Sequence, residues 1–505
     1  MNYFVSESSY LFNSGTEHSQ AKRTALFNAM GNEAKFVTRN YSRFLNRDLT
    51  REGLTQAEGL NMYDYFQGIT EVERKEQPLR LLKQIPLDEY HLVSTNPNYT
   101  CMEHDGRPIA KINVMPATVG LIDNINYRDR FGHDVMRENF DWRGFKSSVD
   151  YFHQNGDLGT QLFLNRDGQP VIEITHMNIG KKVQPTMWKL LNYKGHSYRF
   201  NNENQMFLFF LNELMSQNPG STIISDRRSL DPIIADVQNA AAKFAYFHDT
   251  HTPDVQAPVH GKLYDAYKLA LEDRPEAFDA VIVPTEKQRA DLAQRYPEDH
   301  FIAIPDTYVS SEQLAAGRAA SSNREHRIIF SGRLAPEKQP EHAIRVLKKV
   351  LDQVPDAQLE FRGYASSDDE QKQLDEQVKT LAVEDHVTFG PYLAPTELPD
   401  RLKDSAVIVQ TSREEGLGMN LIEAMAYGVV PVSFGITYGT NDLITDGVNG
   451  AIVAQNDDDA MAAKIIELLT NSDLWHKESK AAIAKAATYD AKTVYNAWDG
   501  ILAKA

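Results

Sequence analysis

The chain has very little cysteine, and this excludes several classes of protein. Cys101 is the only cysteine among its 505 residues. One thiol cannot build an intrachain disulfide framework, and it cannot supply the thiolates of a cysteine-based zinc cluster. We therefore expect a protein of the reducing cytoplasm, with the inner face of the membrane as the alternative location.

The chain also lacks an excess of positive charge and any long apolar run. Its formal net charge is −17 and its pI is near 5.4, so we expect no nonspecific binding to nucleic acid. The longest apolar cluster, Met206–Met215, is about half a membrane span and is typical of a core helix. The opening MNYFVSESSYLF has no basic segment before an apolar core, so we expect no secretory signal.

The residues that are abundant indicate a globular protein of more than one domain. Hydrophobic residues make up 42% of the chain and charged residues 24%, which are ordinary values for a folded domain. A chain of this length predicts two or three domains, each with its own core.

The stretch Thr411–Phe434, TSREEGLGMNLIEAMAYGVVPVSF, contains a loop, a helix and a strand in that order. The apolar run Ala406–Gln410 predicts a buried strand before it, and Met419–Tyr427 predicts the helix. The run VVPVSF after Gly428 predicts a second strand. The loop therefore lies at the carboxyl end of a strand, where open parallel sheets bind ligands.

This loop carries the residue types that a nucleotide–sugar requires. Gly416 and Gly418 let the backbone approach a ligand, and the helix start offers free N–H groups and a positive dipole end to a diphosphate. Glu415 and Glu423 are eight residues apart, so a helix beginning near Glu415 would place both carboxylates on one face. The alternative is that both acids are solvated helix charges.

A second loop in the same half of the chain carries two cations. The sequence HRIIFSGRLAPEKQP predicts a strand at Arg327–Ser331, and Gly332, Arg333 and Lys338 follow it before a helix. Two cations at the carboxyl end of a strand suit a diphosphate, whereas ordinary surface ion pairs are the alternative. The acidic run Asp457–Asp459 has the context of a surface helix, and it does not have the pattern of a cation site.

The first part of the chain predicts another α/β unit. A strand, the turn containing Ser14, Gly15 and Thr16, and a helix capped by Thr16 or Ser19 follow one another. Such a glycine turn between strand and helix is a potential anion site, although most such turns have no ligand. Further on, His248 lies just past the buried run KFAYFHD, at the ligand-binding edge of a sheet. A purely structural histidine is the alternative there.

The region from about Leu79 to Tyr198 has a different pattern. Short runs of Tyr, Phe, Ile and Val are separated by the pairs Asp105–Gly106, Asn155–Gly156 and Asp167–Gly168, which are strong hairpin signals. We predict an inserted antiparallel β-rich module. Its exposed edges make it a candidate surface for self-association or acceptor docking, and a lid without any partner is the alternative.

Several of these motifs resemble one family. GRLAPEK, followed by REEGLGMNLIEAMAYGVVPV, resembles the retaining GT-B glycosyltransferases of the glycogen-synthase-like group, in which two Rossmann-like domains face each other across a donor cleft. SGTEHSQAKR, the β insertion and PTEKQRADL are similar to a Gram-positive subgroup. That subgroup contains poly(glycerol-phosphate) wall teichoic acid α-glucosyltransferases and accessory-secretion O-GlcNAc transferases.

The resemblance implies an α/β fold of two Rossmann-like domains (GT-B) with an inserted antiparallel β-rich domain. The segment Gln313–Glu325 is then the linker, and Trp498 anchors a C-terminal helix that can cross back to the first domain. The expected ranges are 1–78 and 199–312 for the acceptor domain, 79–198 for the insertion, 326–485 for the nucleotide-sugar domain, and 486–505 for the terminal helix.

The resemblance also implies a role for each residue at a matching position. Arg333 and Lys338 would hold the diphosphate and support its departure, and His248 would lie near the sugar. Glu415 would contact the hydroxyls of the donor sugar, and Glu423 those of the ribose. The other expected donor-binding residues are Ser14, Gly15, Thr16, Gly332, Gly416, Gly418, Met419, Asn420 and Leu421, with Gly390 and Tyr392 beside the uracil.

The activity implied is a retaining, UDP-sugar-dependent hexosyl transfer that needs no metal or other cofactor. The favoured reaction moves glucose from UDP-glucose to poly(glycerol-phosphate) wall teichoic acid. The alternative moves GlcNAc from UDP-GlcNAc to Ser or Thr of a surface protein. A catalytically inactive partner subunit is the third reading, and the presence of Arg333, Lys338, Glu415 and Glu423 disfavours it. A homo-oligomer or a complex with a related subunit is expected.

Overall fold

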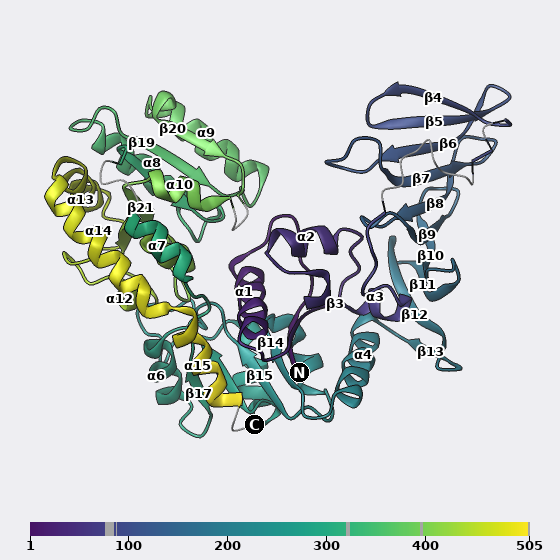
Figure 1. The fold of residues 1–505 in the computed structure, drawn as a ribbon, viewed down its shortest axis with the longest axis horizontal. Coiled ribbons are helices and arrows are strands. Elements are labelled where there is room, and N and C mark those ends of the chain that lie inside the picture. Colours follow the sequence, from purple (N-terminus) through teal and green to yellow (C-terminus); the bar gives the residue numbers. More distant parts are fainter. Residues whose placement is uncertain (76–84, 87, 320–323, 394–396, 503–505) are drawn as a thin grey trace.

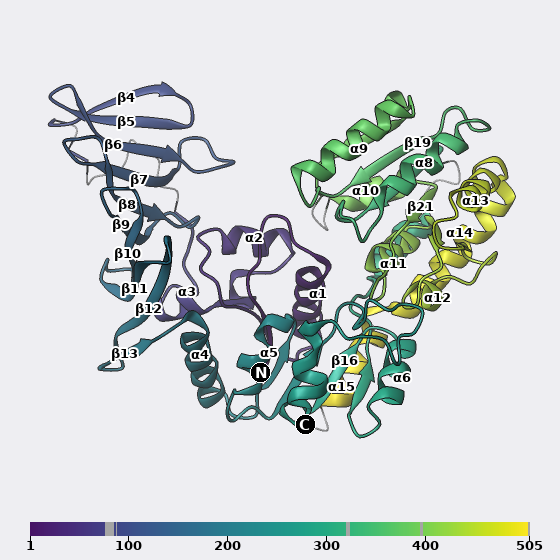
Figure 2. The same ribbon diagram turned by 180° about the vertical axis from the view of Figure 1, so that it is seen from behind.

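A computed structural model describes residues 1–75, 85–86, 88–319, 324–393 and 397–502. These residues form two parallel sheets and one ten-stranded antiparallel sheet (Figure 1). The two parallel sheets belong to separate helix-covered lobes, and the antiparallel sheet stands to the side of the first lobe (Figure 2). The predicted fold of two Rossmann-like domains with an antiparallel insertion is confirmed.

The first parallel sheet is assembled from two distant parts of the chain. Its order is β17-β16-β15-β14-β1-β2-β3, and β1 is buried along its whole length because helices cover both faces. The strands are β1 (Asn2–Ser6), β2 (Ala34–Thr38), β3 (Gly59–Asn61), β14 (Thr222–Ser225), β15 (Ala242–Tyr246), β16 (Ala280–Val283) and β17 (Phe301–Ala303). The helices are α1 (Gly15–Ala29), α2 (Leu45–Arg51), α3 (Met62–Gln67), α4 (Glu203–Gln217), α5 (Asp231–Ala235) and α6 (Glu286–Arg295).

The insertion lies between α3 and α4 and is one continuous meander. Each strand pairs with its neighbour in sequence, and at Asp105–Gly106 both residues have positive φ, as a type I′ turn requires. The predicted start near Leu79 lies outside the described residues. The strands are β4 (His91–Asn96), β5 (Tyr99–His104), β6 (Arg107–Val114), β7 (Ile122–Arg128), β8 (Asp134–Phe140), β9 (Lys146–Phe152), β10 (Leu158–Leu164), β11 (Pro170–Ile179), β12 (Lys182–Tyr193) and β13 (His196–Phe200).

The second parallel sheet has the order β20-β19-β18-β21-β22-β23. Its strands are β18 (Arg327–Ser331), β19 (Gln358–Arg362), β20 (Val387–Gly390), β21 (Val407–Gln410), β22 (Val430–Phe434) and β23 (Ala451–Val453). The helices of this lobe are α8 (Pro340–Val350), α9 (Asp368–Thr380), α10 (Leu398–Asp404), α11 (Met419–Ala426), α12 (Thr440–Leu443), α13 (Asp458–Thr470) and α14 (Ser472–Ala486).

The segment expected to be a linker begins with a helix. Helix α7 (Ser311–Ala319) packs on α11 and α14, and Leu314 is buried in the core of the second lobe. The small residues of this segment permit close packing: a Cβ at Gly317 would lie 2.0 Å from the carbonyl oxygen of Ala426. Composition alone does not distinguish such a helix from a flexible connection. Residues 320–323 of this segment lie outside the described residues.

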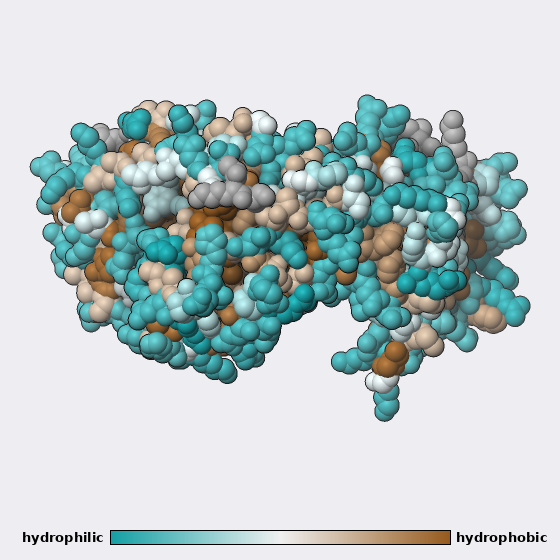
Figure 3. All heavy atoms as spheres, turned by 90° about the horizontal axis from the view of Figure 1, so that it is seen from below, coloured by the Kyte–Doolittle hydropathy of each residue, from teal (hydrophilic) through white to brown (hydrophobic). Residues whose placement is uncertain are grey.

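The C-terminal helix α15 (Ala491–Leu502) packs on the first lobe, beside α1 (Figure 1). Trp498 is 1% exposed, and its ring lies against Phe4, Phe27 and Tyr246. No helix in the described part of the chain is both long and apolar enough to cross a membrane. The face seen in Figure 3 is mostly hydrophilic, and its apolar side chains form small separate patches.

Candidate functional site

The two parallel sheets direct the carboxyl ends of their strands at one cavity of about 570 Å³. The loop after β15 enters it from the first lobe, and the loops after β18, β19 and β21 enter it from the second. This is the position at which open α/β sheets bind ligands. We call its two sides the first-lobe wall and the second-lobe wall.

Most of the residues expected in the site line this cavity. They are Ser14, Gly15, Thr16, His248, Gly332, Arg333, Lys338, Tyr392, Glu415, Gly416, Gly418, Met419, Asn420 and Glu423. Gly390 and Leu421 do not line it. Leu421 is fully buried in the core under α11, and Gly390 lies behind Arg362, where a Cβ would be 2.1 Å from the guanidinium.

The second-lobe wall holds its cations in ion pairs with its own acids. Lys338 Nζ lies 2.7 Å from Glu415 Oε1, and the Ser412 hydroxyl donates to the same oxygen at 2.7 Å. Arg333 pairs with Glu337 and is 47% exposed. Burial lowers the pKa of Lys338, but the carboxylates of Glu415 and Asp249 raise it more, so the ammonium stays charged.

The geometry corrects one expectation about the acids of this wall. Helix α11 begins at Met419, because Gly418 has a left-handed φ of 92° that turns the chain just before it. Glu415 therefore lies in the loop, and it does not share a helix face with Glu423. Both acids nevertheless line the cavity, and Glu423 pairs at 2.9 Å with Lys22 of the first lobe.

Two helix N-termini face each other across the cavity. Helix α1 begins at Gly15 and α11 at Met419, and a Cβ at Gly15 would be only 3.7 Å from the Met419 sulfur. The residue that precedes α1 is Ser14, whose N–H and hydroxyl bond Glu17, so neither Thr16 nor Ser19 is the cap. Two helix starts offer free N–H groups and positive dipole ends to an anion.

The first-lobe wall contains a buried charge network. His248 Nε2 lies 2.8 Å from Asp226 Oδ1, and Asp226 also pairs with Arg23. Arg23 and Asp226 are 4% and 0% exposed. Burial raises the pKa of Asp226, but Arg23 and His248 lower it more, so it stays a carboxylate. The imidazole of His248 is therefore held by a fixed ion pair.

The aspartate next to His248 faces the opposite wall. Burial raises the pKa of Asp249 to about 6, with Lys338 opposing the shift and Glu415 adding to it. Where these groups meet, the two lobes touch: a Cβ at Gly416 would be 2.2 Å from the His248 carbonyl oxygen. Close approach of the lobes therefore requires glycine at position 416.

A polar chain joins the lobes at the end of the cavity that His18 and Tyr392 line. His18 Nδ1 lies 2.6 Å from Glu52 Oε2, and its Nε2 lies 2.7 Å from the Tyr392 hydroxyl. Burial lowers the pKa of His18, whereas Glu52 raises it, and the net direction is upward. The rings of Phe12 and Tyr364 pack against the ring of Tyr392, so this end of the cavity also has an aromatic surface.

Sequence reasoning missed several residues that line the cavity, among them His18, Lys22 and Asp306. Asp306 follows β17 as His248 follows β15, so the rule that found His248 also applies to it. His18 and Lys22 lie within α1, and only their distance from its N-terminus indicates that they line the cavity.

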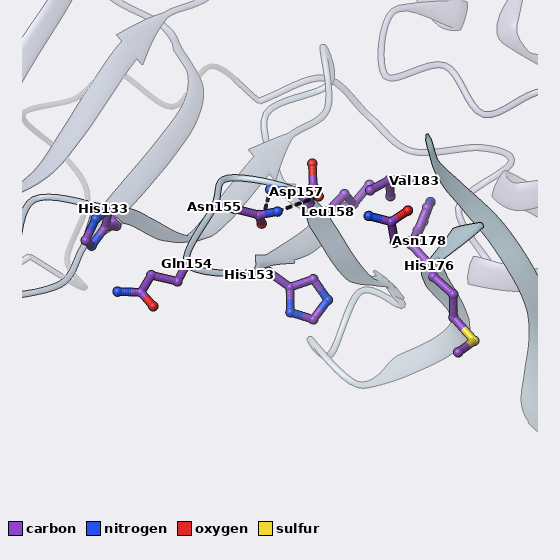
Figure 4. A pocket seen from close by; sticks show the side chains of 10 residues that line it. His133, His153, Gln154, Asn155, Asp157, Leu158, His176, Asn178 and Val183 are labelled. Carbon is purple, nitrogen blue, oxygen red and sulfur yellow. Dashed lines mark hydrogen bonds between the residues drawn. The ribbon is translucent and has the colours of Figure 1, made fainter. Parts of the chain in front are cut away.

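A second cavity of about 570 Å³ lies on the ten-stranded sheet, on the turns that join β7 to β8 and β9 to β10 and on the hairpin of β11 and β12. His133, His153 and His176 lie at separate places along it, and Asn155 donates to Asp157 at 2.7 Å (Figure 4). In the described part of the chain, no group of three or more His, Cys, Asp or Glu side chains is arranged to hold a metal ion.

Comparisons with known families give two overlapping matches. Residues 16–392, well over half of the chain, match the family described as Accessory Sec system protein. Residues 316–488 match Glycosyl transferases group 1. The second match contains the loops after β18, β19 and β21, which form the second-lobe wall.

Individual relatives have low sequence identity to this chain, but the matches extend over most of it. The poly(glycerol-phosphate) alpha-glucosyltransferase of Bacillus subtilis is 22% identical over 75% of this chain and 55% of its own length. The GtfA subunit of the UDP-N-acetylglucosamine–peptide N-acetylglucosaminyltransferase of Streptococcus pneumoniae is 22% identical over 91% of both chains. The solved pneumococcal O-GlcNAc transferase GtfA, in complex with UDP and GlcNAc, superposes with a TM-score of 0.85 at 18% identity, over 100% of this chain and 98% of that one.

Proposed function

Because this chain belongs to the accessory Sec system protein family and its residues 316–488 form a group 1 glycosyl transferase domain, we propose that it is a retaining GT-B glycosyltransferase. It transfers a hexose from a UDP-sugar to an acceptor of the cell envelope. The observation that supports this best is the convergence of Arg333, Lys338, Glu415 and Glu423 on one cavity between two lobes.

Each wall contributes a different part of the reaction. Breaking the bond between the anomeric carbon and the phosphate develops negative charge on the leaving UDP. Lys338, Arg333 and the two helix starts stabilise that charge. Lys338 exchanges Glu415 for the diphosphate, which frees Glu415 to accept hydrogen bonds from the sugar hydroxyls.

Retention of configuration requires attack on the face that the UDP leaves. The acceptor hydroxyl forms the new bond to the anomeric carbon, and its proton passes to the departing phosphate oxygen. No carboxylate of the chain is assigned as a nucleophile, and this route needs no metal or other cofactor. His248 lines the first-lobe wall of the cavity, and this position supports a role beside the sugar.

The favoured acceptor is poly(glycerol-phosphate) wall teichoic acid, with glucose as the transferred sugar. The glucosyltransferase of B. subtilis supports this choice. Transfer of GlcNAc to Ser or Thr of a surface protein is the alternative, and the GtfA relative supports it over more of its length. That relative is named as a subunit, so a complex with a related subunit is part of the proposal, as is the cytoplasmic location.

One experiment separates these readings. The purified chain is incubated with UDP-glucose or UDP-GlcNAc, each with and without poly(glycerol-phosphate) and a Ser/Thr-rich peptide, and UDP release is measured. We expect UDP release with UDP-glucose and the polymer. Release with UDP-GlcNAc and the peptide would favour the alternative, and a chain that binds acceptor but turns over neither donor would be a non-catalytic subunit.

A further inference from the structure

Among the first-lobe residues that line the cavity, two described side chains have a buried polar atom without a hydrogen-bond partner. These atoms are Nδ1 of His248 and Oδ1 of Asp306. The two side chains are 8% and 5% exposed, and both residues line the cavity. Leaving buried polar atoms unpaired costs free energy, so groups in this position are expected to meet a ligand.

The imidazole is held in the orientation that presents Nδ1. Asp226 only accepts hydrogen bonds, so Nε2 of His248 carries a proton toward it. Arg23 pairs with Asp226 and lies against the rings of Phe4 and Tyr246. Nδ1 is then turned toward Asp306 Oδ2, at 4.0 Å.

The spacing and the charge define the chemistry of the missing partner. Nδ1 of His248 lies 4.0 Å from Oδ2 of Asp306, so one ligand oxygen can lie at hydrogen-bond distance from both the imidazole and the Asp306 carboxylate. The Asp306 carboxylate needs a donor and repels an anion, which excludes a phosphate group. A hydroxyl fits, because it donates its proton to the Asp306 carboxylate while its oxygen lies beside Nδ1 of the imidazole.

We propose that Asp306 and His248 bind one hydroxyl group of the substrate, and that Asp226 and Arg23 are positioning residues for the imidazole. This assignment rests on the proposed function of the cavity. Under this assignment the first-lobe wall binds a hydroxyl group, whereas the second-lobe wall and the two helix N-termini bind the phosphates. The hydroxyl belongs either to the donor sugar or to the acceptor, and the two sources are separable by experiment.

The test is Asp306→Asn, which keeps the size of the side chain and removes its charge. UDP binding, hydrolysis of the UDP-sugar without acceptor, and transfer to acceptor are each measured. We expect unchanged UDP affinity and a loss of at least about tenfold in turnover. If hydrolysis and transfer fall together, the hydroxyl is on the donor sugar. If hydrolysis is kept and the acceptor KM rises, it is on the acceptor.

Controls make the outcome decisive. Asp356→Asn changes another aspartate that bonds a histidine, His326 at 2.9 Å, but on the surface, and it should change none of the three values. Asp306→Ser repeats the test if the first variant is poorly folded. Wild-type values in the Asp306 variants would overturn the assignment alone, whereas a wild-type chain without UDP binding would overturn the proposed function as well.

The positioning role of Asp226 has a separate readout. Asp226→Asn should lower the same step as Asp306→Asn, and the double variant should lose little more than either single one, because both act on one hydroxyl through His248. Additive losses would show that Asp226 acts elsewhere and would overturn this part of the proposal.

Discussion

The two walls of the cavity hold their charges in different ways. In the second-lobe wall, Arg333 is 47% exposed and Lys338 23%, and each pairs with an acid of the same wall. In the first-lobe wall, Arg23 and Asp226 are 4% and 0% exposed. A pair that solvent reaches exchanges its partner for a ligand at a lower cost than a fully buried pair does. The second-lobe wall is therefore suited to bind and release a leaving group, and the first-lobe wall to hold an imidazole in place.

The sharpest contrast is expected in stability. Asp226→Ala leaves Arg23 as an unpaired buried charge, so the free energy of unfolding should fall by about 3–5 kcal/mol. Glu337→Ala likewise removes the acid that pairs with Arg333, but this pair lies near the surface. The free energy of unfolding should therefore fall by only about 0–1 kcal/mol. Urea denaturation of both variants measures the difference. Equal losses would show that the two walls do not differ in this respect.

The rate of sugar transfer should depend more on the second-lobe wall than on the first-lobe wall. Lys338→Ala removes a cation that stabilises the leaving diphosphate, so kcat should fall by about 10²–10³-fold while the protein stays folded. Glu415→Ala should also abolish sugar transfer. Lys349→Ala is the control, because Lys349 pairs with Asp459 on the surface. UDP release is the measurement, and near-normal turnover in either cavity variant would refute the assigned roles.

The contact between the walls has its own test at Gly416. A Cβ there would be 2.2 Å from the His248 carbonyl oxygen, so Gly416→Ala should hold the lobes apart. Misplacement of about 1 Å costs up to about 10²-fold in rate, and we expect a loss in this range without a loss of stability. Gly500→Ala, where a Cβ meets nothing within 4 Å, is the control. Unchanged turnover would mean that the closed contact is not required.

The smallest effect is a pH dependence of donor binding. The pKa of His18 is raised above 6.5, so its charged bonds to Glu52 and Tyr392 are complete below pH 6.5 and are lost as the pH rises through the raised value. Donor KM should therefore rise with pH by about two- to tenfold, the worth of one hydrogen bond. Other groups face His18, notably Glu17 and Glu423, so the comparison is with His18→Gln. An identical profile in that variant would exclude His18.

The second-lobe wall could be predicted from the sequence because each of its loops lies next to its own strand and helix in the chain. The strand predicted at Arg327–Ser331 is β18 with the same bounds, and the one predicted at Ala406–Gln410 begins a single residue later, at Val407. The helix predicted from Met419 does begin there, so the condition under which Glu415 and Glu423 would share a helix face is not met.

The first-lobe wall was predictable only in part. Arg23 and Asp226 are 203 residues apart, and the insertion separates them in the chain. No local pattern pairs them, and only the strand order β14-β1 brings them together. Asp306 did carry a local signal, since it follows a strand at the same edge as His248. The polar chain from His18 to Tyr392 depends on the meeting of two lobes, which a sequence pattern does not encode.

The most direct test of the central claim, that one cavity between the lobes holds a nucleoside diphosphate, is a calorimetric titration with UDP. We predict a single site that binds UDP more tightly than UMP, with affinity that falls sharply in Lys338→Ala and is kept in Lys349→Ala. Absence of UDP binding, or binding that Lys338→Ala leaves unchanged, would contradict the account.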